Sequence, residues 1–236
     1  MKTLLFSRTQ LAPLLSAFAL ILGMSCPSLA LDEVKQYVRV TNTQHMDLPA
    51  GATVRVKDSL DELTIEGWDQ PGVEITTIKS TKYEYAAAEH DKAAHELERV
   101  KISAEQKGNE LVITTDHPRR RAVTLTYLVK VPRNTRLIVN GYGEVHFDGV
   151  TSDIQANMHK GLITLRLSDG QYGIDARTKL GSVISDFPGD TKRRIWVVGR
   201  NFTGNAQAPH KLVLREGFGD IVILKGAVPQ EPAPKS

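Results

Sequence analysis

The chain has 236 residues, of which 30 are Lys or Arg and 27 are Asp or Glu, giving a formal net charge of +3. The first 30 residues contain two of the basic residues and no acidic one, so 28 basic residues face 27 acidic ones in the remainder. A nearly neutral chain lacks the excess of basic charge that is typical of nucleic-acid-binding proteins. The composition therefore argues against a nucleic-acid partner and against attraction to an anionic membrane.

The N-terminal segment, residues 1–30, has the pattern of a secretory signal peptide. Lys2 and Arg8 precede an apolar run over 11–24, and Ser28-Leu29-Ala30 places small residues at the two positions that determine cleavage. The apolar run is too short and too interrupted for a membrane span, and no later stretch approaches the length of one. The sequence predicts an exported protein, periplasmic or at the cell surface, whose mature chain has no transmembrane span.

Cys26 is the only cysteine of the chain. If it is removed with the signal peptide, the mature chain has no disulfide and no thiol. The alternative is a lipid anchor at Cys26, since the small Ser25 precedes it, although Leu22 lies one place too far upstream for the usual lipoprotein motif and Pro27 follows. In either case stability must come from packing and strand pairing.

A short motif recurs in the second half of the chain: a glycine, any residue, and an aliphatic residue. It starts at Gly143, Gly161, Gly181 and Gly219, with spacings of 18, 20 and 38 residues. A second apolar motif falls between the copies, at 154–156, 174–176, 195–197 and 212–214. Two short strands in each period of about 19 residues are typical of a repeat architecture. The sequence therefore predicts an all-β fold, a β-solenoid-like stack of strands, over residues 31–227.

The first half begins the same pattern and then interrupts it. Strands are predicted at 37–41 and 53–56, and the segments 63–68 and 73–75 resemble the later repeat. An insertion follows, in which residues 83–99 are rich in Ala and Glu without Gly or Pro and predict an amphipathic helix. Three further elements are predicted in the rest of the chain: a hairpin over 100–115, the longest strand at 123–131, and a disordered proline-rich tail at 228–236.

Strand alternation assigns a direction to each side chain of the repeat. The following residues are predicted to point inward: Val145, Phe147, Ile154, Ala156, Ile163, Leu165, Leu167, Ile174, Ala176 and Val183. The following are predicted to point outward: Glu144, His146, Gln155, Asn157, Thr164, Arg166, Asp175 and Arg177. The repeated glycines are predicted at corners, where positive φ or close backbone approach is needed.

The alternation weakens toward the C-terminus. Residues 195–198, 212–214 and 221–224 are continuously apolar, which predicts strands buried on both faces. The cover could be the helix at 83–99 or the N-terminal strands. The alternative is a partner surface or self-association through these strands.

The chain resembles the putative-adhesin, or β-strand-repeat, family of exported bacterial domains of unknown function. The resemblance covers roughly residues 50–225. It rests on the long strand ending in Val129-Lys130-Val131-Pro132, the turn into Leu137-Ile138-Val139, and the glycine-aliphatic repeats. It also rests on a helix followed by the apolar pairs around 100–102 and 111–113. The resemblance implies a noncatalytic β-solenoid-like domain at the cell envelope, and it supplies no catalytic residues.

Motifs for catalysis, metals and cofactors are weak or missing, so no catalytic residue, no metal site and no cofactor is predicted. His95 begins a zinc-protease-like pattern, but Arg99 stands where the second metal-binding histidine is needed. The binding candidates are outward-facing residues of successive repeats, together with one aromatic residue of the apolar C-terminal runs. They are His146, His159, Arg166, Asp175, Arg177 and Trp196.

The predicted function is that of a noncatalytic, adhesin-like envelope or cell-surface protein that presents a strand-repeat surface to an envelope polysaccharide or protein partner. One alternative is a periplasmic structural or regulatory module that acts through protein–protein contacts of its C-terminal strands. Another is a carbohydrate-active β-helix enzyme, which would need clustered carboxylates. Basic clusters at 119–121 and 192–194 suit an anionic surface polymer or serve as charged turns that block sheet growth.

Overall fold

The computed structural model describes residues 34–226 except Ala50, 117–121, Asp169 and 194–197. The predicted signal peptide and tail therefore lie outside the described residues. The described part of the chain is all-β with one short helix, as predicted. The elements are β1 (Arg39–Met46), β2 (Thr53–Ser59), β3 (Glu62–Trp68), β4 (Val73–Thr81), a 3-10 turn (Ala87–Glu89), α1 (His90–Glu98), β5 (Lys101–Lys107), β6 (Glu110–Asp116), β7 (Val123–Pro132), β8 (Arg136–Asp148), β9 (Ile154–Leu167), β10 (Tyr172–Leu180), β11 (Val183–Ser185), β12 (Asp190–Arg193), β13 (Arg200–Gly204) and β14 (His210–Lys225).

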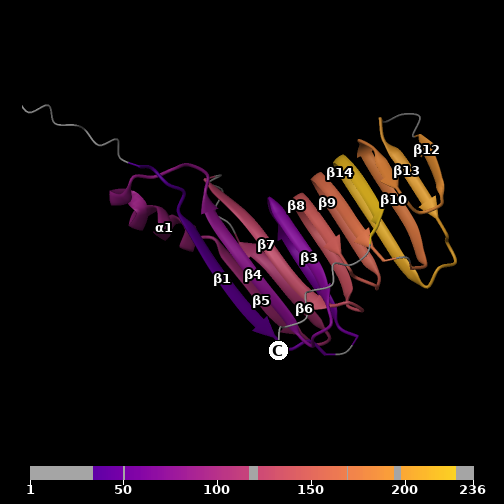
Figure 1. Ribbon diagram of the computed structural model, residues 1–236, viewed down its shortest axis with the longest axis horizontal. Helices are drawn as coiled ribbons and strands as arrows, with labels where there is room; N and C mark the ends of the chain where they lie inside the picture. Colours follow the sequence, from indigo (N-terminus) through magenta and orange to yellow (C-terminus); the bar gives the residue numbers. More distant parts are fainter. Residues whose placement is uncertain (1–33, 50, 117–121, 169, 194–197, 227–236) are drawn as a thin grey trace, which may run out of the picture. The chain divides into compact units, whose positions relative to one another are not determined.

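These strands form one mixed sheet in which the order along the main path is β1-β4-β7-β3-β8-β9-β14-β10-β13-β12 (Figure 1). The central strands pair in parallel: β7 with β3, β3 with β8, and then β8, β9, β14 and β10 in succession. Antiparallel strands close both ends, with β4 and β1 beyond β7, and β13 and β12 beyond β10. The strands at the centre of the sheet are therefore parallel, and the strands at its two edges are antiparallel.

Two of the long central strands, β8 and β14, have two segments that pair with different strands on one side, whereas both segments of β9 pair with β8 and β14. The first segment of β8 pairs with β2 and its second segment with β3. In the same way β14 pairs first with β10 and then with β11. We call each two-segment unit a tier; in spatial order the five tiers are residues 53–68, 136–148, 154–167, 210–225 and 172–185.

The spatial order of the tiers differs from their order in the sequence. The tier that comes last in the chain, β14, lies between β9 and β10. Although β10 follows β9 in the sequence, the two strands do not pair. The position between them is occupied by β14, which comes after the β12–β13 hairpin in the chain. The 38-residue spacing before the last glycine motif therefore contains β11, this hairpin with its connections and the first segment of β14.

The repeated glycines mark the bend between the two segments of a tier. In register across the tiers lie Asp61, Gly143, Gly161, Gly219 and Gly181, and all five have positive φ. We call these five residues the bend column. A Cβ atom built on Gly161 would lie 1.8 Å from the carbonyl oxygen of Gly143, and one on Gly219 would lie 1.8 Å from that of Gly161. The predicted corner role of these glycines is confirmed, since they combine positive φ with close backbone approach.

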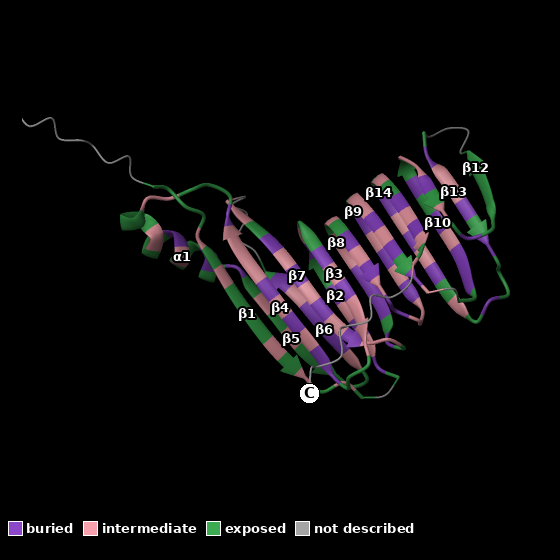
Figure 2. Cartoon of the chain, in the orientation of Figure 1, coloured by how far each residue is buried: buried purple, intermediate pink, exposed green. Residues whose placement is uncertain are grey.

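The predicted side-chain directions are confirmed (Figure 2). All ten residues predicted to point inward are buried, from Val145 on β8 to Val183 on β11. All eight predicted to point outward are half-buried or exposed. The inward residues of both segments belong to one hydrophobic core. Local alternation thus decides which face of each strand is buried.

Two of the predicted element boundaries are wrong. The helix is shorter than 83–99, because Tyr85 forms two backbone hydrogen bonds with Gln36 in an isolated bridge. The longest strand is β14, with 16 residues, and not β7, with 10. Glycines that would end a straight strand instead bend β14 and let its pairing continue.

The prediction of strands buried on both faces is also wrong for the residues that are described. Leu212, Leu214, Ile221 and Ile223 are buried, but the intervening Val213, Val222 and Leu224 are only half-buried. The helix packs on β4 and β1 rather than on β14. Outward aliphatic residues suit the strand conformation without being buried, so continuous apolar runs are a poor sign of double burial here. Residues 195–197 lie outside the described residues.

A substitution at the bend tests the role of close backbone approach. We expect Gly161→Ala to lower the free energy of unfolding by at least about 3 kcal/mol, because the new Cβ would force two tiers apart. Gly108→Ala is the matched control, since Gly108 also has positive φ but its Cβ would meet open space. The control should lose only about 1 kcal/mol. Urea unfolding measures both, and equal losses would contradict a bend that depends on backbone contact.

Candidate functional site

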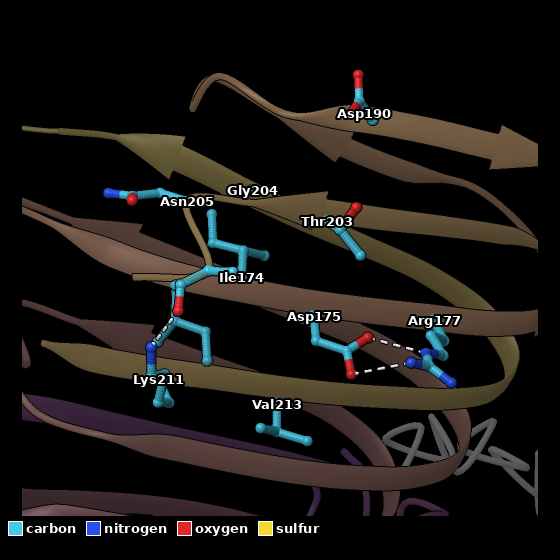
Figure 3. A pocket seen from close by; sticks show the side chains of 12 residues that line it. Ile174, Asp175, Arg177, Asp190, Thr203, Gly204, Asn205, Lys211 and Val213 are labelled. Carbon is cyan, nitrogen blue, oxygen red and sulfur yellow. Dashed lines mark hydrogen bonds and ion pairs between the residues drawn. The ribbon is translucent and has the colours of Figure 1, made fainter. Parts of the chain in front are cut away.

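An open cavity of about 510 Å³ lies where β10, β13 and β14 meet (Figure 3). Its lining includes Asp175, Arg177, Thr203, Lys211 and Val213. Lys211 donates a hydrogen bond from Nζ to the carbonyl oxygen of Ala206, 2.6 Å away, which fixes the side chain at one end of the cavity. The cavity is built by strand register, since Val213 and Thr203 flank Asp175 on its two neighbouring strands.

Asp175 is the centre of a charged hydrogen-bond network. Its Oδ1 accepts from Arg177 Nε at 2.8 Å, and its Oδ2 accepts from Arg177 Nη2 at 3.1 Å and from Arg215 Nη2 at 2.6 Å. Burial alone would raise the pKa of Asp175, but the hydrogen bonds and positive charges of Arg215 and Arg177 outweigh it and lower that pKa. The carboxylate therefore stays ionised and serves to orient two guanidinium groups.

Both of these arginines belong to a longer row of polar side chains on the outer face. Adjacent strands place the following residues side by side in register: Asn140, Asn157, Arg215, Arg177, Asn201 and Lys192. We call this set the Asn/Arg row. Asn157 Nδ2 donates to Asn140 Oδ1 at 3.1 Å, and Asn201 Oδ1 is buried without a hydrogen-bond partner among the described residues. The row presents amide, guanidinium and ammonium groups across six neighbouring strands.

The structure brings together only two of the six binding candidates, Asp175 and Arg177. His146 and Arg166 lie on the second segments of their tiers, beyond the bend, where His146 is 3.6 Å from Glu144 and Arg166 donates to Asp148 at 3.1 Å. The candidates therefore do not line one face. The two remaining candidates are separate again, because His159 is exposed at the bend of β9 and Trp196 lies outside the described residues.

Several residues of the site were missed by the sequence analysis, among them Arg215 and Asn201. Arg215 continues the outward alternation of Val213, but the apolar run 212–214 was interpreted as buried on both faces. Asn201 lies on β13, which enters the sheet beside β10 only through the fold. Extending the alternation of inward and outward residues to position 215 would have identified Arg215 as outward-facing. No local sequence pattern marks Asn201.

Glu216 is a second residue with unusual chemistry. Its side chain is buried at the bend of β14, where Oε1 accepts from the backbone N–H of Phe218 at 3.3 Å. Its Oε2 has no hydrogen-bond partner among the described residues. Burial raises the pKa of Glu216 to about 7, although backbone N–H groups of Phe218 and Gly217 act in the opposite direction. A carboxyl group with this pKa can exchange its proton near neutral pH, but its burial keeps it from surface ligands.

The described part of the chain contains neither a metal-binding cluster nor a membrane-spanning helix. Among these residues no group of three or more His, Cys, Asp or Glu side chains is placed to hold a metal ion. Within the same residues, no helix has the length and apolar character needed to cross a membrane.

No family model matches the chain, and no curated protein matches it. Solved structures do resemble it. A putative cell adhesion protein from Clostridium sporogenes is 12% identical, with a TM-score of 0.44 over 80% of this chain and 100% of that one. A putative adhesin from Bacteroides fragilis is 11% identical (TM-score 0.35; 78% and 97% covered), as is one from Parabacteroides merdae (0.29; 61% and 67%).

The buried carboxyl group predicts a pH dependence of stability. Between pH 4.5 and about 7 the folded state keeps a proton on Glu216 that the unfolded state releases. The contribution of this group to the free energy of unfolding therefore falls as pH rises through that window, by at most about 3 kcal/mol, and is lost above the folded pKa.

We expect Glu216→Gln to remove this fall and to make the protein more stable than the wild type at pH 8. Urea unfolding at several pH values between 4 and 8 measures the effect. Glu84→Gln, at an exposed carboxyl group, is the control and should leave the pH dependence as it is. A Glu216→Gln variant with the wild-type pH profile would show that the carboxyl group is ionised in the folded state.

Proposed function

We propose that this chain is a noncatalytic, adhesin-like protein, exported to the cell envelope or cell surface, whose tiers form a β-solenoid-like stack. The stack presents its outer face to an extended polymer or protein partner. The observation that carries the proposal is the Asn/Arg row. Six neighbouring strands, each about 4.8 Å from the next, give this row a length of about 24 Å, which suits an extended partner better than a small molecule.

The chemistry of the carboxyl groups supports a binding role over catalysis. A glycoside hydrolase needs one carboxyl group as an accessible acid and a second as a nucleophile or base. Asp175 is held by Arg177 and Arg215 and is kept ionised, so it lacks a proton to donate. Glu216 could keep a proton near pH 7, but only 3% of its surface is exposed, so a substrate could not reach it.

Export is supported by the N-terminal segment of the sequence, with its basic start, apolar stretch and Ser28-Leu29-Ala30. A mature chain that starts after Ala30 would diffuse in the periplasm or medium. A chain that starts at an acylated Cys26 would be tethered to the membrane. Both forms place the stack in contact with envelope material.

The first expected result is export. Mass spectrometry of fractions from cells that express the full chain should find the protein without its signal peptide, starting after Ala30 or at Cys26, in the envelope, periplasm or medium. A cytosolic protein that still carries residues 1–30 would contradict the proposal. The measurement also decides between the free and the lipid-anchored form.

The second expected result is binding through the Asn/Arg row. The purified protein should cosediment saturably with isolated cell envelopes. The double variant Asn157→Ala/Arg177→Ala should bind about 10-fold more weakly, because it removes two hydrogen-bonding side chains of the row. Thr164→Ala is the matched control, since Thr164 points outward on the second segment of β9, away from the row. Equal binding of the double variant and the control would exclude the row as the contact surface.

A further inference from the structure

The bend column carries an exposed ridge of aromatic and aliphatic side chains. Tyr142, Phe218 and Leu180 each come directly before a glycine of the column and are exposed by 51%, 50% and 39%. His159 of β9 lies between the two aromatic residues, with ring centroids 5.1 Å from Tyr142 and 6.3 Å from Phe218. Leu180 is in register with Phe218 on the next strand. We call these four residues the bend ridge.

The ridge is a product of the tight bend. Because the backbones of neighbouring tiers touch at the column, the residues before the glycines cannot turn inward, and their side chains remain outside. Three of the eight large hydrophobic side chains that are exposed within the described residues lie on this ridge. The ridge crosses four neighbouring strands, and exposed aromatic and aliphatic side chains gathered in this way mark an interaction surface.

The ridge is bordered by a second cavity whose charged lining residues are mainly acidic. An open cavity of about 510 Å³ is lined by Tyr142 together with Lys160, Asp61, Glu62 and Glu144. Three carboxylates and one ammonium group give this lining a formal charge of −2. Glu62 and Glu144 lie directly beside each other in parallel register, which is an unfavourable pairing of like charges, although the His146 ring lies 3.6 Å from Glu144.

We propose that the bend ridge and this cavity bind a linear glycan whose sugars carry free amino groups. This inference rests on the proposed function and names the polymer. The apolar C–H face of a pyranose ring packs on aromatic side chains, and its hydroxyl and amino groups point sideways, where the carboxylates can accept hydrogen bonds. A row of four strands spans about 14 Å, so the ridge contacts several sugar rings of one chain.

The charges of the cavity favour a cationic glycan over other possible ligands. The acidic cavity repels anionic glycans and anionic lipid headgroups. An apolar peptide or acyl chain on the ridge would remove Glu62 and Lys160 from water without giving either a new hydrogen-bond partner, which is unfavourable. A cationic glycan can pack its sugar rings on the aromatic side chains and can donate hydrogen bonds from its amino groups to the carboxylates.

The test uses isothermal titration calorimetry of the purified protein with three soluble hexasaccharides: a glucosamine oligomer, its N-acetylated form and a uronic acid oligomer. The glucosamine oligomer should bind saturably, the N-acetylated oligomer at least fivefold more weakly, and the uronic acid oligomer not at all. Equal or tighter binding of either of the other two oligomers, or no binding of the glucosamine oligomer, would overturn the proposal.

Variants then locate the binding. Tyr142→Ala/Phe218→Ala should weaken binding of the glucosamine oligomer at least 10-fold. Tyr83→Ala is the matched control, because Tyr83 is 63% exposed and lies outside the ridge, and it should bind within twofold of the wild type. Glu62→Gln/Glu144→Gln should reduce the preference for the glucosamine oligomer over the N-acetylated one. Thermal unfolding verifies that each variant is folded. Unchanged binding of the glucosamine oligomer by the folded Tyr142→Ala/Phe218→Ala variant would contradict binding at the bend ridge.

The outcomes separate this inference from the proposed function. If envelope binding depends on the Asn/Arg row but the glucosamine oligomer does not bind, only the ridge assignment fails. If the protein is not exported and does not bind envelopes, the proposed function fails, whatever the calorimetry gives.

Discussion

Close contact between main chains at the bend column is the constraint on which the rest of the structure depends. The carbonyl oxygen of one tier occupies the space where a side chain of the next would begin, as Gly161 and Gly219 show. The pairing of β8, β9 and β14 continues past this contact, with a register shift between β8 and β9 at Gly141–Gly143. One hydrophobic core is then shared by both segments.

The same constraint produces both surfaces to which we assign binding. In-register tiers align outward side chains from strand to strand, and this alignment creates the Asn/Arg row on the first segments. At the bend the tight backbone leaves no room inside, so Tyr142 and Phe218 project outward. The row offers hydrogen bonds and the ridge offers apolar rings beside carboxylates. Both surfaces cross several strands and therefore suit a chain-like partner.

Much of this fold follows from local sequence, and the rest depends on long-range pairing. Alternation predicted the inward and outward side chains, and the glycine motif predicted the bends, because both are properties of single strands. The order of the tiers was not predictable, since all tiers carry similar motifs and β14 could pair with any of them. The site was found only in part for the same reason: alternation cannot tell that His146 and Asp175 lie on opposite sides of a bend, or that β13 brings Asn201 beside Arg177.

The position of β14 between β9 and β10 is the claim that joins the fold to the surfaces, and disulfide trapping tests it most directly. A disulfide forms only between residues whose Cα atoms lie within about 7 Å. Under oxidation the pair Asn157→Cys/Arg215→Cys, on β9 and β14, should cross-link, and the pair Asn157→Cys/Arg177→Cys, on β9 and β10, should stay reduced. Cross-linking of the second pair and not the first would show that the tiers stack in sequence order, which would contradict both the topology and the Asn/Arg row.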